Sequence, residues 1–402
     1  MNSPRRVVGV GTVATLALLA AIAPTAQAGE RDGHVEPAST AGTVRVVAAP
    51  DLRLQAHDRV AAMSTREKAA SIVMGHIPTT DLDALAGYMS STAIGGFILM
   101  GANIPSTEAA LREVTAALTL DAALPPLIGI DQEGGDVSRL PWDDFPAATT
   151  LKEQPPEVAR DAFAARGALV QRAGIGVNFG VVADITDDRS MFIYRRALGT
   201  SPEGGAERVS AAVTGEGSHA LSTLKHFPGH GAAPGDSHAG IPSTGMSLQD
   251  WVATDAVPFQ AGIDAGAPVL MFGHLAYTAV DSAPATLSAE WHRIAREDLG
   301  FTGIAITDDL GMLQASGIPA YQDPVANAVA AIAAGNDMVL SVVYSSAESA
   351  PRVVEGVVAA IDAGTLSQER LDEAALRVME ARLTLAAQGR GLVPCGECAP
   401  AG

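Results

Sequence analysis

Short apolar runs alternate with longer Ala-rich stretches through most of the chain. The longer stretches, such as 106–120, 157–173 and 203–219, place apolar residues at helical spacing. The short runs have the length of buried strands, and each leads into a polar loop. Seven runs are clear, at 96–100, 126–130, 177–185, 223–227, 268–272, 303–307 and 337–342. Strands that alternate with helices predict a parallel sheet and a fold of the α/β class.

Seven such strands predict a (β/α)8 TIM-type barrel, although the pattern does not reveal the eighth strand. A doubly wound open sheet is the alternative, but no Gly-rich dinucleotide or phosphate-binding motif follows any run. Before the first run, Ser64 and Glu67 form a capping pattern that predicts a helix from 64 to about 75. The last long helix is expected over 367–387.

The first 28 residues have the features of an export signal. Arg5 and Arg6 precede a mostly apolar run at 7–23, and 26–28 reads Ala-Gln-Ala, a pattern that signal peptidases cleave. The alternative is an uncleaved membrane anchor, since the run approaches the ~20 residues that span a bilayer. We expect cleavage and a secreted protein, extracellular or cell-wall associated, with no stable membrane insertion. The predicted organisation is a signal peptide at 1–28, an arm at 29–53, one catalytic barrel at 54–390 and a tail at 391–402.

Composition narrows the possible partners. The chain has 45 acidic and 26 basic side chains, a formal charge of −19, which disfavours binding to nucleic acid. Apolar residues make up 48% of the chain, enough for a large core. Lysine is rare, with Lys68, Lys152 and Lys225 only. Cys395 and Cys398 lie in a Pro- and Gly-rich tail, where a small disulfide is favoured over a metal or redox site in an exported protein.

Polar residues gather where the predicted strands end. In a parallel barrel these ends form one face, on which active residues lie. Three of the nine histidines fall between positions 226 and 238, beside one of the three lysines. The candidate residues are Asp131, Arg139, Lys225, His226, His230, Asp236, His238, His274, Asp308 and Asp309.

Three kinds of chemistry could use such a cluster. His226 and His230 have the spacing of zinc ligands on a helix, but Pro228 and Gly229 between them break the helix that this spacing requires. We therefore expect no metal and no other cofactor. Lys225 could form a Schiff base in a lyase, but an amine among several carboxylates stays protonated.

Glycoside hydrolysis is the third possibility. It needs a group that protonates the leaving oxygen and, for retention of configuration, a carboxylate that attacks the anomeric carbon. Asp308 at a strand end suits the attack. Asp236 lies two residues before His238, so it could fix the ring tautomer and leave the other nitrogen to exchange protons.

Four motifs in order resemble glycoside hydrolase family 3, over roughly residues 55–390. The Asp-Ser-His element resembles its β-N-acetylglucosaminidase (β-hexosaminidase) branch. The motifs are Asp131-Gln132-Glu133-Gly134-Gly135, Arg196-Ala197-Leu198-Gly199, Lys225-His226-Phe227-Pro228-Gly229-His230-Gly231 with Asp236-Ser237-His238, and Ile306-Thr307-Asp308-Asp309-Leu310-Gly311-Met312.

The resemblance implies an exported, retaining exo-β-N-acetylglucosaminidase with roles at the matching positions. Asp308 would be the nucleophile that forms a covalent glycosyl-enzyme, and His238 the general acid and base, oriented by Asp236. Asp309 would support its loop. His274, Asn178 and Asp184 are expected to be structural or to support the site. Residues expected to bind sugar hydroxyls are Asp131, Arg139, Arg196, Lys225 and His226.

Several alternatives stay open at this point. Asp136 stands where the family usually has a basic residue, and would add negative charge near the site. A phosphorylase would replace water with phosphate, and a His acid/base would avoid repelling that anion. A non-catalytic cell-wall sugar binder is the alternative outside enzymes. The expected partner is a small oligosaccharide or glycoside from peptidoglycan or chitin. A long cleft for a polymer is not expected, because only 4% of residues are aromatic and sugar faces pack on aromatic rings. The expected oligomeric state is a monomer.

Overall fold

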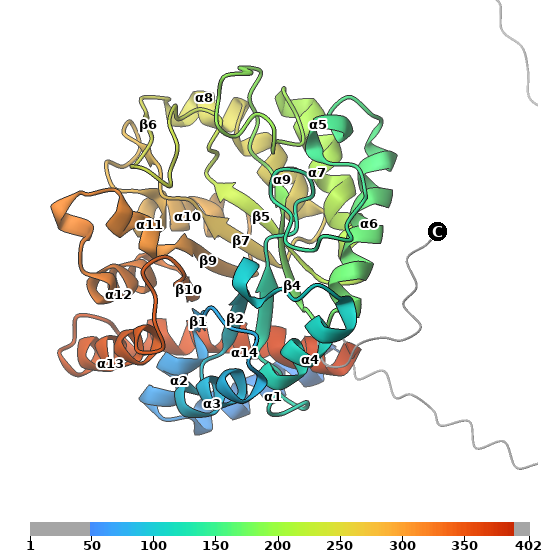
Figure 1. The fold of residues 1–402 in the computed structure, drawn as a ribbon. Coiled ribbons are helices and arrows are strands. Elements are labelled where there is room, and N and C mark those ends of the chain that lie inside the picture. Colours follow the sequence, from blue (N-terminus) through green and yellow to red (C-terminus); the bar gives the residue numbers. More distant parts are fainter. Residues whose placement is uncertain (1–48, 390–402) are drawn as a thin grey trace, which may run out of the picture. The chain divides into compact units, whose positions relative to one another are not determined.

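The computed structural model describes residues 49–389, and these form a barrel of eight parallel strands surrounded by helices (Figure 1). The strands close in the order β1-β10-β9-β7-β5-β4-β3-β2. Their bounds are β1 Val73–Gly75, β2 Gly96–Leu99, β3 Leu127–Ile130, β4 Val177–Val182, β5 Leu221–Phe227, β7 Val269–Phe272, β9 Ile304–Asp309 and β10 Met338–Leu340. The predicted barrel is therefore confirmed, and each of the seven predicted runs contains or overlaps a barrel strand.

The eighth strand, β1, lies where the sequence predicted the end of a helix. The Ser64–Glu67 capping box starts α2, Thr65–Ser71, as expected, but the helix stops at Ser71. β1 then pairs with β10, with Val73 opposite Val339, and with β2 on its other side, which closes the barrel. The prediction of a helix to about 75 was wrong, because three buried residues directly after a helix show no periodicity of their own.

Helices cover the outside of the barrel. A second, two-stranded sheet of β6 (Ser243–Thr244) and β8 (Ala276–Tyr277) lies outside it. The α-helices are α1 Ala49–Ala62, α2 Thr65–Ser71, α3 Leu82–Thr92, α4 Glu108–Leu118, α5 Ala148–Leu151, α6 Pro156–Arg172, α7 Pro202–Glu216, α8 Leu248–Ala253, α9 Ala256–Asp264, α10 Ala289–Arg293, α11 Leu310–Ala315, α12 Pro324–Ala334, α13 Ser349–Asp362 and α14 Gln368–Gln388.

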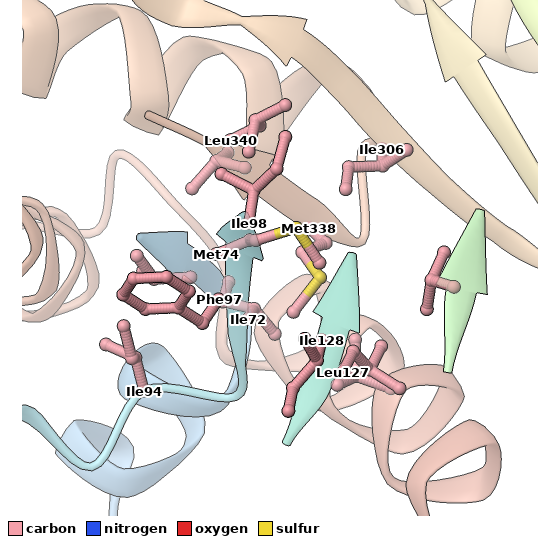
Figure 2. Close-up of a cluster of buried hydrophobic side chains, with 14 of the residues drawn as sticks. Ile72, Met74, Ile94, Phe97, Ile98, Leu127, Ile128, Ile306, Met338 and Leu340 are labelled. Carbon is pink, nitrogen blue, oxygen red and sulfur yellow. The ribbon is translucent and has the colours of Figure 1, made fainter. Parts of the chain in front are cut away.

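The barrel interior is apolar at the end opposite the polar loops. Met74 and Met338 both lie against Gly96 of β2, where a Cβ atom would stand only 3.0–3.1 Å from their methyl carbons. Figure 2 shows these side chains with Phe97 and Ile306 in a larger buried cluster. This packing fixes the strands relative to one another. The polar residues at the opposite strand ends are therefore held in fixed positions.

Several predictions concern residues outside the described range. The signal peptide at 1–28, the tail at 391–402 and the Cys395–Cys398 disulfide all lie there. The predicted arm at 29–53 overlaps α1, which begins at Ala49. Within residues 49–389, no helix is both long and apolar enough to cross a membrane.

Candidate active site

A cavity of about 440 Å³ opens at the carboxyl ends of the strands. This volume falls in the usual range of ~300–1,000 Å³ for small-molecule sites. The structure brings seven of the eight predicted site residues to its wall, and the eighth, Asp236, contacts one of them. The seven are Asp131, Arg139, Arg196, Lys225, His226, His238 and Asp308.

Lys225 on β5 lies at the centre of a buried ion-pair cluster. Its Nζ is 3.0 Å from Oδ1 of Asp131 and 2.7 Å from Oε1 of Glu133. Burial alone would lower the pKa of Lys225, but these two carboxylates hold the pKa above its usual value. Lys225 therefore stays protonated and donates hydrogen bonds, which argues against Schiff-base chemistry.

Two arginines complete this side of the cavity. Nη2 and Nε of Arg196 contact the two carboxylate oxygens of Glu133 at 2.7 and 2.9 Å, a bidentate pair. Arg139 contacts Asp131 at 3.3 Å. The result is a set of fixed donors and acceptors that matches the vicinal hydroxyls of a sugar.

His226 is held in one orientation by Asp184. Its Nδ1 lies 2.7 Å from Oδ2 of Asp184, whose carboxylate also accepts the backbone N–H groups of His226 and His230. Nε2 of His226 faces Nη2 of Arg196 at 3.3 Å. Because a carboxylate can only accept, the Nδ1–H group of His226 donates this hydrogen bond to Asp184.

Asp308 lies at the end of β9 on the opposite side of the barrel from β3. Burial would raise its pKa, but His226, His274 and the backbone N–H of Asp309, 2.8 Å from Oδ1, together hold the pKa below its usual value. Asp308 is therefore an ionised carboxylate in the wall of the cavity, the state that a carboxylate nucleophile needs.

Asp309 holds together the start of α11 and the loop after β10. It accepts the backbone N–H groups of Gly311, Val342 and Val343 at 2.8–3.0 Å. Burial raises its pKa to about 6. Its backbone carbonyl contacts Nε2 of His274 at 2.8 Å, so His274 supports this strand end.

His238 differs from the other site residues because its side chain is 57% exposed. Its Nδ1 lies 2.7 Å from Oδ1 of Asp236, which also accepts the His238 backbone N–H at 3.0 Å. Burial would raise the pKa of Asp236, but these two hydrogen bonds lower it. Asp236 thus stays ionised and fixes the ring, leaving Nε2 for proton exchange.

The loop that carries His238 has a rigid base. Nε1 of Trp251 donates to the carbonyl of Pro228 at 2.8 Å, and the Tyr277 hydroxyl donates to the carbonyl of Gly229 at 2.7 Å. Trp251 and Phe227 pack edge to face with ring centroids 5.8 Å apart. Three of the chain's few aromatic side chains therefore support the base of this loop.

Three contributors were missed in the sequence. The sequence analysis assigned no function to Glu133, yet its carboxylate pairs with both Lys225 and Arg196. Gln132 is fully buried, and its Oε1 accepts the backbone N–H groups of Arg139 and Leu140 at 2.8 and 2.9 Å. Both lie inside the Asp131–Gly135 motif, so their place in it was the available signal.

Phe192 is the third missed residue, and no sequence signal marks it. Its ring lies 5.5 Å from the ring of His238, edge to face, and it also lines the cavity. Asp136, predicted to add charge near the site, pairs with Arg195 at 2.6 Å on the exposed surface. Its charge is therefore compensated by this pair. Among residues 49–389, no group of three or more potential ligands is placed to hold a metal ion.

The Glycosyl hydrolase family 3 N terminal domain matches residues 64–381. A beta-hexosaminidase of Pseudomonas aeruginosa is 36% identical over 253 residues, which cover 61% of this chain and 74% of the relative. One of Xanthomonas oryzae pv. oryzae is 35% identical over 246 residues, covering 58% and 73%.

Two solved structures are similar as well. A family 3 beta-N-acetylglucosaminidase from Paenibacillus sp. str. FPU-7 has a TM-score of 0.75 and 29% identity, with 81% of this chain and 63% of that one covered. A beta-N-acetylhexosaminidase from Beutenbergia cavernae has a TM-score of 0.69 and 28% identity, with 80% and 99% covered. The chain therefore belongs to glycosyl hydrolase family 3 and is a glycoside hydrolase of the β-N-acetylhexosaminidase type.

Proposed function

We propose that the protein is an exported, retaining exo-β-N-acetylglucosaminidase that uses Asp308 as nucleophile and His238 as general acid and base. The observation that carries the proposal is the contrast between two groups on one cavity wall. Asp308 is half-buried at a strand end and held ionised, whereas His238 is exposed on a loop and bonded to Asp236. A retaining mechanism needs one group of each kind.

The proposed reaction has two steps. A carboxylate oxygen of Asp308 attacks the anomeric carbon, the bond to the leaving oxygen breaks, and His238 Nε2 gives that oxygen its proton. Nε2 then takes a proton from water, whose oxygen attacks the anomeric carbon and releases Asp308. Asp236 stabilises the ring in both steps, because its charge favours the imidazolium and its hydrogen bond fixes the tautomer.

The buried cluster around Lys225 supports removal of a terminal sugar. Asp131 and Lys225 with their arginine partners form the wall on the side of β3, β4 and β5. Lys225 and Glu133 are almost completely buried, which leaves little room beyond a sugar bound there. A terminal sugar with free hydroxyls can hydrogen-bond to these donors and acceptors. An oligosaccharide that extended beyond this position would be blocked by the buried ion pairs.

Export and the origin of the substrate are part of the proposal. Residues 1–28 support secretion, and a secreted enzyme of this type meets fragments of peptidoglycan or chitin. N-terminal sequencing of protein recovered from the medium tests this point, with Gly29 as the expected first residue. We also propose that the protein acts as a monomer.

The main experiment compares aryl β-N-acetylglucosaminide with aryl β-glucoside as substrates of the purified protein. We expect the first to be preferred, the released sugar to be the β-anomer when first formed, and turnover to fall by about 10³-fold or more in Asp308→Asn. Preference for the glucoside, or unchanged turnover in Asp308→Asn, would contradict the proposal.

The same assay with and without phosphate tests a second candidate. An imidazole repels phosphate less than a carboxylate would, so the presence of His238 at this position also suits a phosphorylase. Phosphate-dependent release of sugar 1-phosphate would favour it. Binding of N-acetylglucosamine by wild-type protein without turnover would instead favour a non-catalytic sugar binder.

A further inference from the structure

One histidine of the cluster at 226–238 has no part in the proposed reaction. His230 follows β5 on the loop that carries the acid/base pair, and it is only 1% exposed. Its backbone N–H donates to Oδ1 of Asp184 at 2.6 Å, and Oδ2 of the same carboxylate contacts Nδ1 of His226 at 2.7 Å. His230 is therefore held by the same buried carboxylate that orients His226 in the cavity wall.

The ring of His230 is bonded to the segment that carries the acid/base pair. Its Nε2 lies 3.1 Å from Oγ of Ser237, the residue between Asp236 and His238. Its Nδ1 is buried and has no hydrogen-bond partner among residues 49–389. Burial lowers the pKa of His230, so the ring is neutral. Because a hydroxyl both donates and accepts, the contact with Ser237 is a hydrogen bond in either tautomer of the neutral ring.

The segment 234–239 is attached to the barrel mainly through Ser237. Five of its six residues are exposed, whereas Ser237 is 3% exposed. The hydrogen bonds between Asp236 and His238 stay within the segment. In the described part of the chain, the bond between Ser237 and His230 is the only hydrogen bond that joins 234–239 to the rest of the protein. The position of the acid/base pair therefore depends on this bond.

An aromatic ring contacts both histidines of this arrangement. The ring centroid of Phe192 lies 5.5 Å from that of His230 and 5.5 Å from that of His238. His230 therefore supports the acid/base residue in two ways, through the hydrogen bond to the segment and through the ring that packs against His238. Such support matters because a displacement of a reacting group by about 1 Å can lower a rate by about 10²-fold.

We propose that His230 is a positioning residue for the acid/base pair, and that its hydrogen bond with Ser237 keeps His238 within reach of the leaving oxygen. The inference rests on the proposed glycosidase function and deepens it. His230 does not line the active-site cavity, so it acts through the segment and not on the substrate. Its loss should therefore impair proton transfer and spare the attack on the anomeric carbon.

The experiment compares two β-N-acetylglucosaminides, a phenyl glycoside whose leaving group needs a proton and a dinitrophenyl glycoside whose leaving group does not. In His230→Leu we expect kcat/KM to fall by about 30-fold for the phenyl glycoside and by less than about threefold for the dinitrophenyl glycoside. His230→Gln should recover most of the loss, because its amide can still bond to Ser237. Ser237→Ala removes the same hydrogen bond from an exposed segment, so it should show the same contrast even if His230→Leu does not fold.

A double variant and a control complete the test. Since His230→Leu and Ser237→Ala remove the same bond, their combination should be no slower than the slower single variant. Ser222→Ala removes a buried β5 hydroxyl that has no hydrogen-bond partner among residues 49–389, and it should leave both kcat/KM values unchanged.

The outcomes separate this proposal from the proposed function. No loss in Ser237→Ala, equal losses with the two glycosides, or losses that multiply in the double variant overturn the role of His230 alone if wild-type protein hydrolyses both glycosides. Absence of hydrolysis of either glycoside by wild-type protein overturns the proposed function as well.

Discussion

His238 Nδ1 lies 2.7 Å from Oδ1 of Asp236, two residues away on the same loop. The two side chains are 57% and 43% exposed, whereas Asp308, which shares the cavity with His238, is half-buried. The acid/base pair is thus carried by a solvent-facing loop, and the proposed nucleophile by a barrel strand. Such a division lets the proton donor meet water in the second step while the proposed nucleophile is held on a rigid strand end.

Loss of the Asp236 charge should slow the reaction more for substrates with a poor leaving group than for those with a good one. In Asp236→Asn the imidazolium loses its ionic partner, so we expect kcat/KM to fall by about 10²-fold for a poor leaving group. Aryl glycosides with acidic phenols need little protonation and should be less affected. The measurement is a plot of log kcat against leaving-group pKa, which should become steeper in the variant. Equal losses across the series would contradict the role of Asp236.

Phe192 should act as a positioning residue for His238. Its ring meets the His238 ring edge to face at 5.5 Å, and its other neighbours include Arg196, 5.4 Å from the ring centroid. Phe192→Ala removes this support, so we expect kcat to fall roughly tenfold. Phe192→Tyr should preserve most of kcat.

A merely structural role for Phe192 would give a different result. Because the Phe192 ring contacts His238, the alanine variant should also change the pH at which kcat falls. An unchanged pH profile together with an unchanged kcat would show that the ring contact has no effect on the acid/base group.

Glu133 should be essential for stability as well as binding. It is the shared partner of Lys225 and Arg196, and its side chain is only 4% exposed. Glu133→Gln leaves two buried cations with one fewer anion, so we expect a loss of roughly 3–5 kcal/mol in the free energy of unfolding. Urea denaturation measures it.

The neighbouring pair of Asp136 and Arg195 provides the control for Glu133. It links the same two loops, but both side chains are largely exposed. Asp136→Asn should leave the urea midpoint unchanged, because exposed ion pairs are screened by water. Equal effects of the two substitutions would show that burial does not set the strength of these pairs.

The fold could be predicted where an element is long enough to show a pattern. The expected helix at 157–173 and the strand at 223–227 are observed as α6 and within β5. β1 could not be found, because its three residues follow a helix and are recognisable only by pairing with β10, more than 260 positions away. The closed barrel was therefore predicted from the seven other strands alone, without β1.

The sequence predicted which side chains lie together at the site. It predicted less well which neighbouring residues hold those side chains in place. Strand ends converge in a barrel, so Asp131, Lys225 and Asp308 were expected on one face. Glu133 was missed because alternation along a strand end does not say which of two nearby carboxylates turns inward. Phe192 was missed because a ring on a long loop has no periodicity, and its contact with His238 depends on the folding of two loops.

Glu216 at the end of α7 should make stability depend on pH. It is fully buried, and its Oε1 accepts a hydrogen bond from Nδ2 of Asn178 at 2.5 Å. Burial raises the pKa of Glu216 to about 8, against the opposing effects of Asn178 and Arg166. The folded protein therefore holds a proton that the unfolded chain releases near pH 4.5, and this stabilisation is lost as pH rises through about 8.

Substitution of Glu216 by Gln should remove that loss, because the amide is neutral at every pH. Between pH 5 and 9 we expect the free energy of unfolding of wild-type protein to fall by roughly 2–4 kcal/mol more than that of Glu216→Gln. Urea denaturation at a series of pH values measures the difference, and subtraction cancels the effects of Asp255 and Asp309, whose pKa values burial also raises. Glu207→Gln, an exposed change on the same helix, should follow the wild-type curve. Parallel curves for wild-type protein and Glu216→Gln would mean that Glu216 is ionised in the folded state.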